Sequence, residues 1–169
     1  MSSMVKIYLA GPFFDKFGIE ARRVAQIKAL LECNPTVDAV FSPKDETDQD
    51  PAIQKLTPMS PEWRRQVFQC DLDGLNGADV LVVIADSETN LNGSDDGTAF
   101  EVGYWHARNE WQRAPQSLPP LPVVVVAQEA ERLNLMLAEA TTYFTDQPLE
   151  LRHLNFEQIP VRAYQGPVI

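Results

Sequence analysis

Carboxylates gather in two short segments of this 169-residue chain, and carboxylates can act as nucleophiles or as proton donors. One segment is DDGTAFEVG, residues 95 to 103, and the other contains Asp71 and Asp73. If two such carboxylates converge, their repulsion raises the pKa of one of them and leaves a carboxylic acid that can donate a proton. The two segments therefore predict a site for displacing a leaving group that departs poorly as an anion.

Glu101 admits two compatible interpretations. Thr98 and Glu101 have the T-x-x-E spacing of a capping box, in which Glu101 would simply close the first turn of a helix. A carboxylate in that turn also feels the positive end of the helix dipole, which keeps it ionised and fixed in direction. If Glu101 faces a crevice, it becomes a good nucleophile for an electrophilic carbon. Gly97 and Gly103 would let a ligand or a neighbouring backbone approach closely.

The segment YLAGPFF, residues 8 to 14, supplies further candidates. Tyr8 belongs to a predicted strand, where a tyrosine is usually a core residue. Near the end of that strand, beside Gly11, its hydroxyl could instead hold the Glu101 carboxylate. Phe13 and Phe14 could also be core residues, yet aromatic rings on a turn after Gly-Pro suit stacking on a flat ligand. We therefore take Gly11 and Phe13 as candidate substrate-binding residues.

The elements that must position these residues alternate between strands and helices. Apolar runs predict strands at 5–9, 37–41, 80–85 and 123–127, with a brief strand near 143. Helical spacing predicts helices at 18–33, 60–77, 98–113 and 133–140, and one more from residue 148. The helix at 60–77 is expected to turn Trp63, Val67, Cys70 and Leu75 toward the core. The polar segment 42–59 is expected to be a loop that covers the site.

Strands that alternate with helices, some of them apolar throughout, are typical of a parallel sheet covered on both faces. We predict one α/β domain over residues 1–169. Its architecture is a doubly wound, five-stranded parallel sheet of the flavodoxin-like order 2-1-3-4-5, with helices on both faces. Such sheets bind ligands beyond the carboxyl ends of the strands, where the winding reverses. This crevice lies between the first and third strands, onto which segments 8–14 and 86–101 open.

Composition excludes several classes of partner. The net charge of −10 weighs against nucleic acid, whose phosphates are bound by clustered lysine and arginine. No apolar run approaches the ~20 residues of a membrane helix, and no signal peptide is apparent, so we expect a cytoplasmic protein. Cys33 and Cys70 are expected to be small buried apolar residues, and His106 and His153 are too scattered for a metal site. We expect no metal and no cofactor.

Four segments resemble the nucleoside 2-deoxyribosyltransferase family in their order and spacing. They are IYLAGPFF (7–14), DLDG (71–74), DDGTAFEVG (95–103) and NLM (134–136). The most specific of them is Asp-x-Gly-Thr-x-Phe-Glu-x-Gly, and the resemblance extends from about residue 6 to residue 140. It implies an enzyme of nucleoside salvage that transfers a 2-deoxyribosyl group between nucleobases, purine or pyrimidine. The implied mechanism is ping-pong and proceeds through a covalent bond to Glu101.

The resemblance also implies roles for single residues. Glu101 would be the nucleophile, and Tyr8 would donate a hydrogen bond to it and position it. Asp71 and Asp95 would contact the base, and one of them would supply its proton. We assign this catalytic role to Asp95 and base binding to Asp71.

The same resemblance implies that the active unit is a homo-oligomer built from dimers. Asn134 and Met136 would reach the 5′-hydroxyl of the sugar bound in a neighbouring subunit. Trp105 and Trp111 are expected to be exposed near the end of the third helix. Exposed tryptophans are enriched in interfaces, so they give weak support for an oligomer. The partners implied are 2′-deoxynucleosides, free nucleobases and further copies of this chain.

Two other functions fit parts of the sequence. A 2′-deoxynucleoside 5′-phosphate N-hydrolase uses a similar scaffold with water as the acceptor, but it needs phosphate-binding groups in the first loop. Gly11-Pro12-Phe13 supplies none of these groups. A non-catalytic nucleotide- or flavin-binding module would have the same fold and would make the carboxylates incidental.

Overall fold

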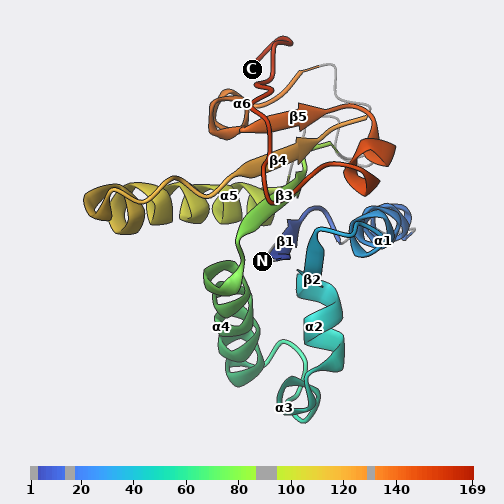
Figure 1. Ribbon diagram of the computed structural model, residues 1–169. Coiled ribbons are helices and arrows are strands. Elements are labelled where there is room, and N and C mark those ends of the chain that lie inside the picture. Colours follow the sequence, from blue (N-terminus) through green and yellow to red (C-terminus); the bar gives the residue numbers. More distant parts are fainter. Residues whose placement is uncertain (1–3, 14–17, 87–94, 129–131) are drawn as a thin grey trace.

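The computed structural model describes residues 4–13, 18–86, 95–128 and 132–169. Five strands form one sheet in the order β2-β1-β3-β4-β5, and every neighbouring pair is parallel (Figure 1). The strands are β1 (Val5–Ala10), β2 (Val37–Phe41), β3 (Val80–Ile84), β4 (Val123–Val126) and β5 (Tyr143–Thr145). The predicted fold class and strand order are confirmed.

Helices connect the strands and pack on both faces of the sheet (Figure 1). The longer ones are α1 (Ile19–Glu32), α4 (Pro61–Gly77) and α5 (Asp96–Arg108). Short elements are α6 (Leu135–Ala140), the π-helical turn η1 (Asn109–Arg113) and the 3₁₀ turns η2 (Ala114–Gln116) and η3 (Pro148–Arg152). The helix predicted from residue 148 is therefore a 3₁₀-helix of only five residues. Within the described ranges, no helix is long and apolar enough to span a membrane.

Two apolar clusters fill the spaces above and below the sheet, because successive strand side chains point to opposite faces. Ile7 and Leu9 of β1 join a cluster with buried residues of α1 and η3. Tyr8 and Ala10 join the other cluster, which α4, α5 and α6 cover. Tyr8 therefore points toward the face that carries α5, the helix that contains Glu101.

The segment 42–59 is not a loop, and that prediction was wrong. It contains the helices α2 (Pro43–Gln49) and α3 (Pro51–Gln54). Both begin with a proline at the first helical position, and the Asp50 side chain accepts a hydrogen bond from the backbone of α3. The helices are short and polar, so they lack the apolar periodicity on which the prediction relied.

Three predictions of burial were also wrong. Trp63, Val67 and Cys70 of α4 are only half-buried, because most of α4 extends beyond the sheet beside α2 (Figure 1). Leu75, nearer the sheet, is fully buried as expected. Cys33 is exposed at the end of α1. Trp105 is fully buried rather than exposed, and its indole N–H donates a hydrogen bond to the backbone oxygen of Leu121.

Candidate active site

Tyr8 and Glu101 meet at the centre of the site. The Tyr8 hydroxyl donates a hydrogen bond to Glu101 Oε1 over 2.5 Å. Tyr8 lies in β1 and is fully buried, whereas Glu101 lies in the second turn of α5 and is half-buried. The two residues are 93 positions apart in sequence, and the parallel pairing of β1 with β3 brings their elements together. The predicted contact between the two side chains is confirmed.

Burial changes the acid–base properties of this pair. The pKa of Glu101 is raised to about 8: burial raises it most, the hydrogen bond from Tyr8 lowers it, and the negative charges of Asp71 and Asp95 raise it. Burial also raises the pKa of Tyr8 far above its ordinary value, and the Glu101 charge adds to this effect. Tyr8 therefore stays protonated and acts as a fixed hydrogen-bond donor to the Glu101 carboxylate.

Asp71 of α4 is the second carboxylate of the site. Burial raises its pKa to about 6, and its charge contributes to the raised pKa of both Tyr8 and Glu101. Its Oδ1 atom is buried, and no donor among the described residues hydrogen-bonds to it. A buried carboxylate oxygen without a donor is costly unless a ligand or water satisfies it. Asp71 is thus available to a bound molecule beside Glu101.

Asp95 caps helix α5. Its Oδ1 accepts a hydrogen bond from the Thr98 backbone N–H over 2.7 Å. The prediction that Thr98 caps this helix with Glu101 as its capping-box partner was wrong, because the helix begins at Asp96 and Thr98 lies inside it. Glu101 therefore does not cap the helix. A Cβ atom at Gly97 would stand 3.2 Å from Asp95 Oδ1, so glycine there leaves room for the cap.

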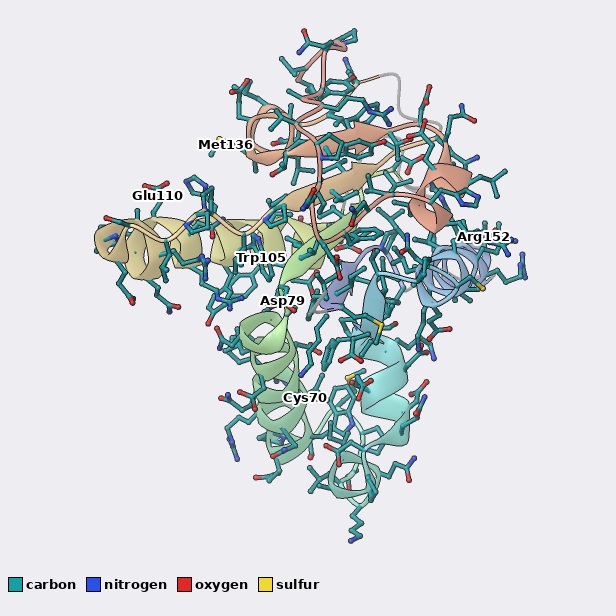
Figure 2. The ribbon with its side chains drawn as sticks, in the orientation of Figure 1. Cys70, Asp79, Trp105, Glu110, Met136 and Arg152 are labelled. Atoms are coloured by element: carbon teal, nitrogen blue, oxygen red, sulfur yellow. The ribbon has the colours of Figure 1, made fainter. Side chains whose placement is uncertain are left out.

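A groove of about 670 Å³ separates α5 from α6. Its walls include Asp95, Val102, Asn134 and Met136, whereas Glu101 faces Tyr8 on β1. Asn134 caps α6 by accepting a hydrogen bond from the Met136 backbone N–H over 2.9 Å. The Met136 side chain is 75% exposed and projects outward from α6 (Figure 2). The structure therefore groups Asn134 and Met136 with Asp95 but places them across α5 from Glu101.

Residues 11–13, which follow β1, pack against the rest of the protein. Gly11 is buried, and a Cβ atom there would approach Ile84 Cβ to 3.1 Å, so glycine lets the chain leave β1 close to β3. Phe13 is half-buried against the apolar cluster under α1. It lines a cavity of about 130 Å³ together with Lys28 and other residues of α1 and α2. Phe14 lies outside the described residues.

Two residues that support Tyr8 were not predicted. The Phe41 ring, at the end of β2, stacks on the Tyr8 ring with centroids 5.1 Å apart and planes 13° from parallel. Phe41 in turn lies on Gly74 of α4, where a Cβ atom would come within 2.6 Å of the ring. Gly74 is the final residue of the DLDG segment, so its spacing from Asp71 was visible in the sequence. Its packing partner, 33 residues away, was not.

The carboxyl end of β3 is fixed by a buried ion pair. Arg23 of α1 contacts the Asp86 carboxylate, and its guanidinium also donates a hydrogen bond to the Asp86 backbone oxygen over 3.1 Å. Both residues are largely buried. Arg23 therefore anchors the chain where it leaves the sheet toward α5 and neutralises one of the carboxylates at this edge.

Comparisons with known proteins identify the family of the chain. The family model described as nucleoside 2-deoxyribosyltransferase matches residues 7–147. A nucleoside deoxyribosyltransferase of Limosilactobacillus fermentum is 32% identical over 143 residues, which are 81% of this chain and 76% of that protein.

Solved structures of similar proteins have the same fold. The 2-deoxyribosyltransferase of the psychrotolerant bacterium Bacillus psychrosaccharolyticus superposes with a TM-score of 0.70 at 26% identity, over 95% of this chain and 99% of that one. A 2-desoxiribosyltransferase from Leishmania mexicana shares the fold, with a TM-score of 0.50 at 18% identity, over 85% of this chain and 91% of that one. The chain therefore belongs to the nucleoside 2-deoxyribosyltransferase family of transferase enzymes.

Proposed function

We propose that this protein moves a 2-deoxyribosyl group from one nucleobase to another through an ester on Glu101, as a step of nucleoside salvage. The observation that carries the proposal is the 2.5 Å hydrogen bond that the buried Tyr8 hydroxyl donates to Glu101 Oε1. It fixes the direction of a carboxylate that has no capping role. A carboxylate oriented in this way suits attack on a sugar carbon that carries partial positive charge.

The reaction has two displacements. In the first, a Glu101 oxygen forms a bond to C1′ while the C1′–N bond breaks, and the departing base takes up a proton. In the second, an acceptor base attacks C1′ from the opposite side to the ester, the ester bond breaks, and the proton on the attacking nitrogen returns to the protein. Two inversions give net retention, the logic of a retaining glycosidase with a base in place of water.

The proton comes from the carboxyl cluster. Because the pKa of Glu101 is about 8 and that of Asp71 is about 6, the two carboxyls together retain close to one proton near neutral pH. These values place the proton mainly on Glu101, so the reactive form, with the proton on Asp71 and the charge on Glu101, is the minor one. The Tyr8 hydrogen bond favours that form because it stabilises the ionised Glu101.

The geometry favours Asp71 over Asp95 as the donor. One Asp95 oxygen is occupied by the Thr98 backbone N–H, whereas Asp71 Oδ1 has no donor among the described residues. Our expectation from the sequence that Asp95 is the acid remains a prediction, and we propose Asp71 as its competitor. Asp95 would then act by holding the start of α5 and by contacting the base.

Substituting each aspartate in turn separates these roles. An amide keeps the size and hydrogen bonding of the carboxyl but cannot give up a proton near pH 7. If Asp71 is the acid, Asp71→Asn should slow poor leaving bases on the order of 100-fold and good ones much less. Asp95→Asn should then lower the rate with all bases by a similar, smaller factor. The measurement is kcat/KM against the pKa of the leaving base, and a steeper dependence for Asp95→Asn would reverse the assignment.

Removing the Tyr8 hydroxyl should change the pH dependence of the reaction. A hydrogen bond to a charged group contributes about 1.5–3 kcal/mol, which corresponds to roughly one to two pKa units. In Tyr8→Phe the pKa of Glu101 therefore rises, so kcat/KM should fall roughly tenfold or more at neutral pH. The acid limb of the pH profile should move to higher pH.

Tyr143→Phe is the matched control, because Tyr143 also donates to a carboxylate, Glu150, over 2.9 Å. It should leave the acid limb in place. An unmoved limb in Tyr8→Phe would show that Tyr8 does not control the ionisation of Glu101.

A chromatographic exchange assay tests the function itself. A 2′-deoxynucleoside is mixed with a second base, and the new nucleoside is measured with purine and pyrimidine acceptors. Acid quenching without acceptor, followed by peptide mass spectrometry, should locate a deoxyribosyl ester on Glu101. Hydrolysis without any transfer to a base would contradict the proposal.

We further propose that the active unit is an oligomer in which Asn134 and Met136 complete a neighbour's site. Their position across α5 from Glu101 supports this arrangement, since neither residue lines the Glu101 side of the helix. Large apolar side chains beside both sites are exposed, which is typical of a surface that a partner covers. They are Phe68, Phe100, Leu135 and Met136, each at least 47% exposed.

A further inference from the structure

The last residues of the chain run along the outer edge of the sheet. Arg162 forms a parallel bridge with Tyr143 of β5, through hydrogen bonds from Phe144 N to Arg162 O over 2.8 Å and from Arg162 N to Thr142 O over 2.9 Å. The Arg162 guanidinium also contacts the Glu150 carboxylate. The segment 162–169, which we call the strap, is thus fixed at its first residue.

The far end of the strap binds the segment that contains Asn134. Leu133 N donates to Pro167 O over 3.1 Å, Ile169 N donates to Leu133 O over 3.0 Å, and Leu135 N donates to Ile169 O over 3.0 Å. These three bonds lie on either side of Asn134. Figure 1 shows the corresponding end of the chain beside α6. The strap therefore supplies the backbone partners of the residues that flank Asn134.

Tyr164 and Gly166 hold the strap in this course. The Tyr164 ring packs edge-on against Phe144 of β5, with centroids 4.8 Å apart, and its hydroxyl donates to Pro167 O over 3.0 Å. A Cβ atom at Gly166 would overlap the Tyr164 ring. A larger residue at position 166 would therefore have to displace the ring from Phe144 or its hydroxyl from Pro167.

We propose that Tyr164 and Gly166 are positioning residues that fix Asn134 and Met136 for the neighbour's sugar through the strap. Helix α6 has six residues, too few to keep its first turn in place without tertiary contacts. The strap provides these contacts at the residue before and the residue after Asn134. The inference rests on the role proposed for Asn134 and Met136, and it adds residues that touch no substrate.

The first test is structural and needs no activity. Amide hydrogen exchange is followed in the peptide around residues 133–136 of Gly166→Ala, Tyr164→Phe and the full-length wild type. Loss of one hydrogen bond corresponds to roughly a fivefold shift in a local opening equilibrium, so exchange should speed up roughly fivefold in Tyr164→Phe and more in Gly166→Ala. Gly77→Ala is the matched control, because a Cβ atom there meets nothing within 4 Å. Unchanged exchange in both strap variants would overturn the proposal.

The second test asks whether the strap acts through the 5′-hydroxyl. The ratio of kcat/KM for a 2′-deoxynucleoside to that for its 5′-deoxy analogue measures this recognition. The ratio should fall roughly fivefold or more in Gly166→Ala and in Asn134→Ala, and the double variant should fall no further. Equal losses for both substrates in the strap variants would show a merely structural role.

If Gly166→Ala does not fold, the same ratio of kcat/KM values is measured in Tyr164→Phe, which keeps the aromatic ring. An unchanged ratio in Asn134→Ala would instead mark a failure of the proposed function. In that case the amide exchange result still stands on its own.

Discussion

Glu101→Ala is expected to abolish deoxyribosyl transfer, with a loss on the order of 10⁴-fold or more, while the fold persists. The loss is large because the substitution removes the atom that forms the ester. Asp95 caps α5, so the helix keeps its cap in this variant. The cost in stability is that of leaving the buried Tyr8 hydroxyl without its acceptor, about 1–3 kcal/mol. The measurements are the exchange assay, circular dichroism and a thermal melt.

Two variants separate catalysis from structure. Glu101→Gln keeps an acceptor for Tyr8 but lacks a carboxylate, so it should be as inactive as Glu101→Ala and more stable. Glu110→Ala makes the same chemical change at an exposed residue of η1 and should be fully active (Figure 2). A folded Glu101→Ala protein with near-normal transfer would show that Glu101 only packs against Tyr8.

Mixing two inactive variants is expected to restore activity. If Asn134 completes a neighbour's site, Glu101→Ala subunits provide an intact Asn134, and Asn134→Ala subunits provide an intact Glu101. After random subunit exchange at equal amounts, about one quarter of the sites combine both intact residues. Activity should rise from near zero toward that fraction, with subunit exchange verified by tagged chains and native mass spectrometry.

A matched control uses the variant that carries both substitutions. When it is mixed with Glu101→Ala subunits, no site contains Glu101, so activity should stay at zero. Sedimentation of the wild type should show an oligomer that carries the activity. An active monomer, or no recovery after verified exchange of subunits, would mean that each chain holds a complete site.

The sequence by itself determined the sheet and the identity of the central pair. The apolar runs at 80–85 and 123–127 are typical of strands buried on both faces, and their alternation with helices predicts a parallel, doubly wound sheet, whose order the structure confirms. This order brings the end of β1 beside the end of β3, so Tyr8 and Glu101 could be paired before their distance was known. The helices α2 and α3 were missed, although Ser42-Pro43 and Asp50-Pro51 are local start signals, because neither helix has an apolar face.

Tertiary structure decided which groups are buried and which face of α5 each side chain takes. The T-x-x-E spacing predicted Thr98 as the cap of α5, whereas in the structure Thr98 is buried inside the helix and Asp95 caps it. The raised pKa values of Asp71 and Glu101 arise from burial by elements far apart in the chain, which no local pattern encodes. Asn134 and Glu101 lie on different sides of α5 because of the way in which α6 packs against it. The types of residues 134–136 do not predict that packing.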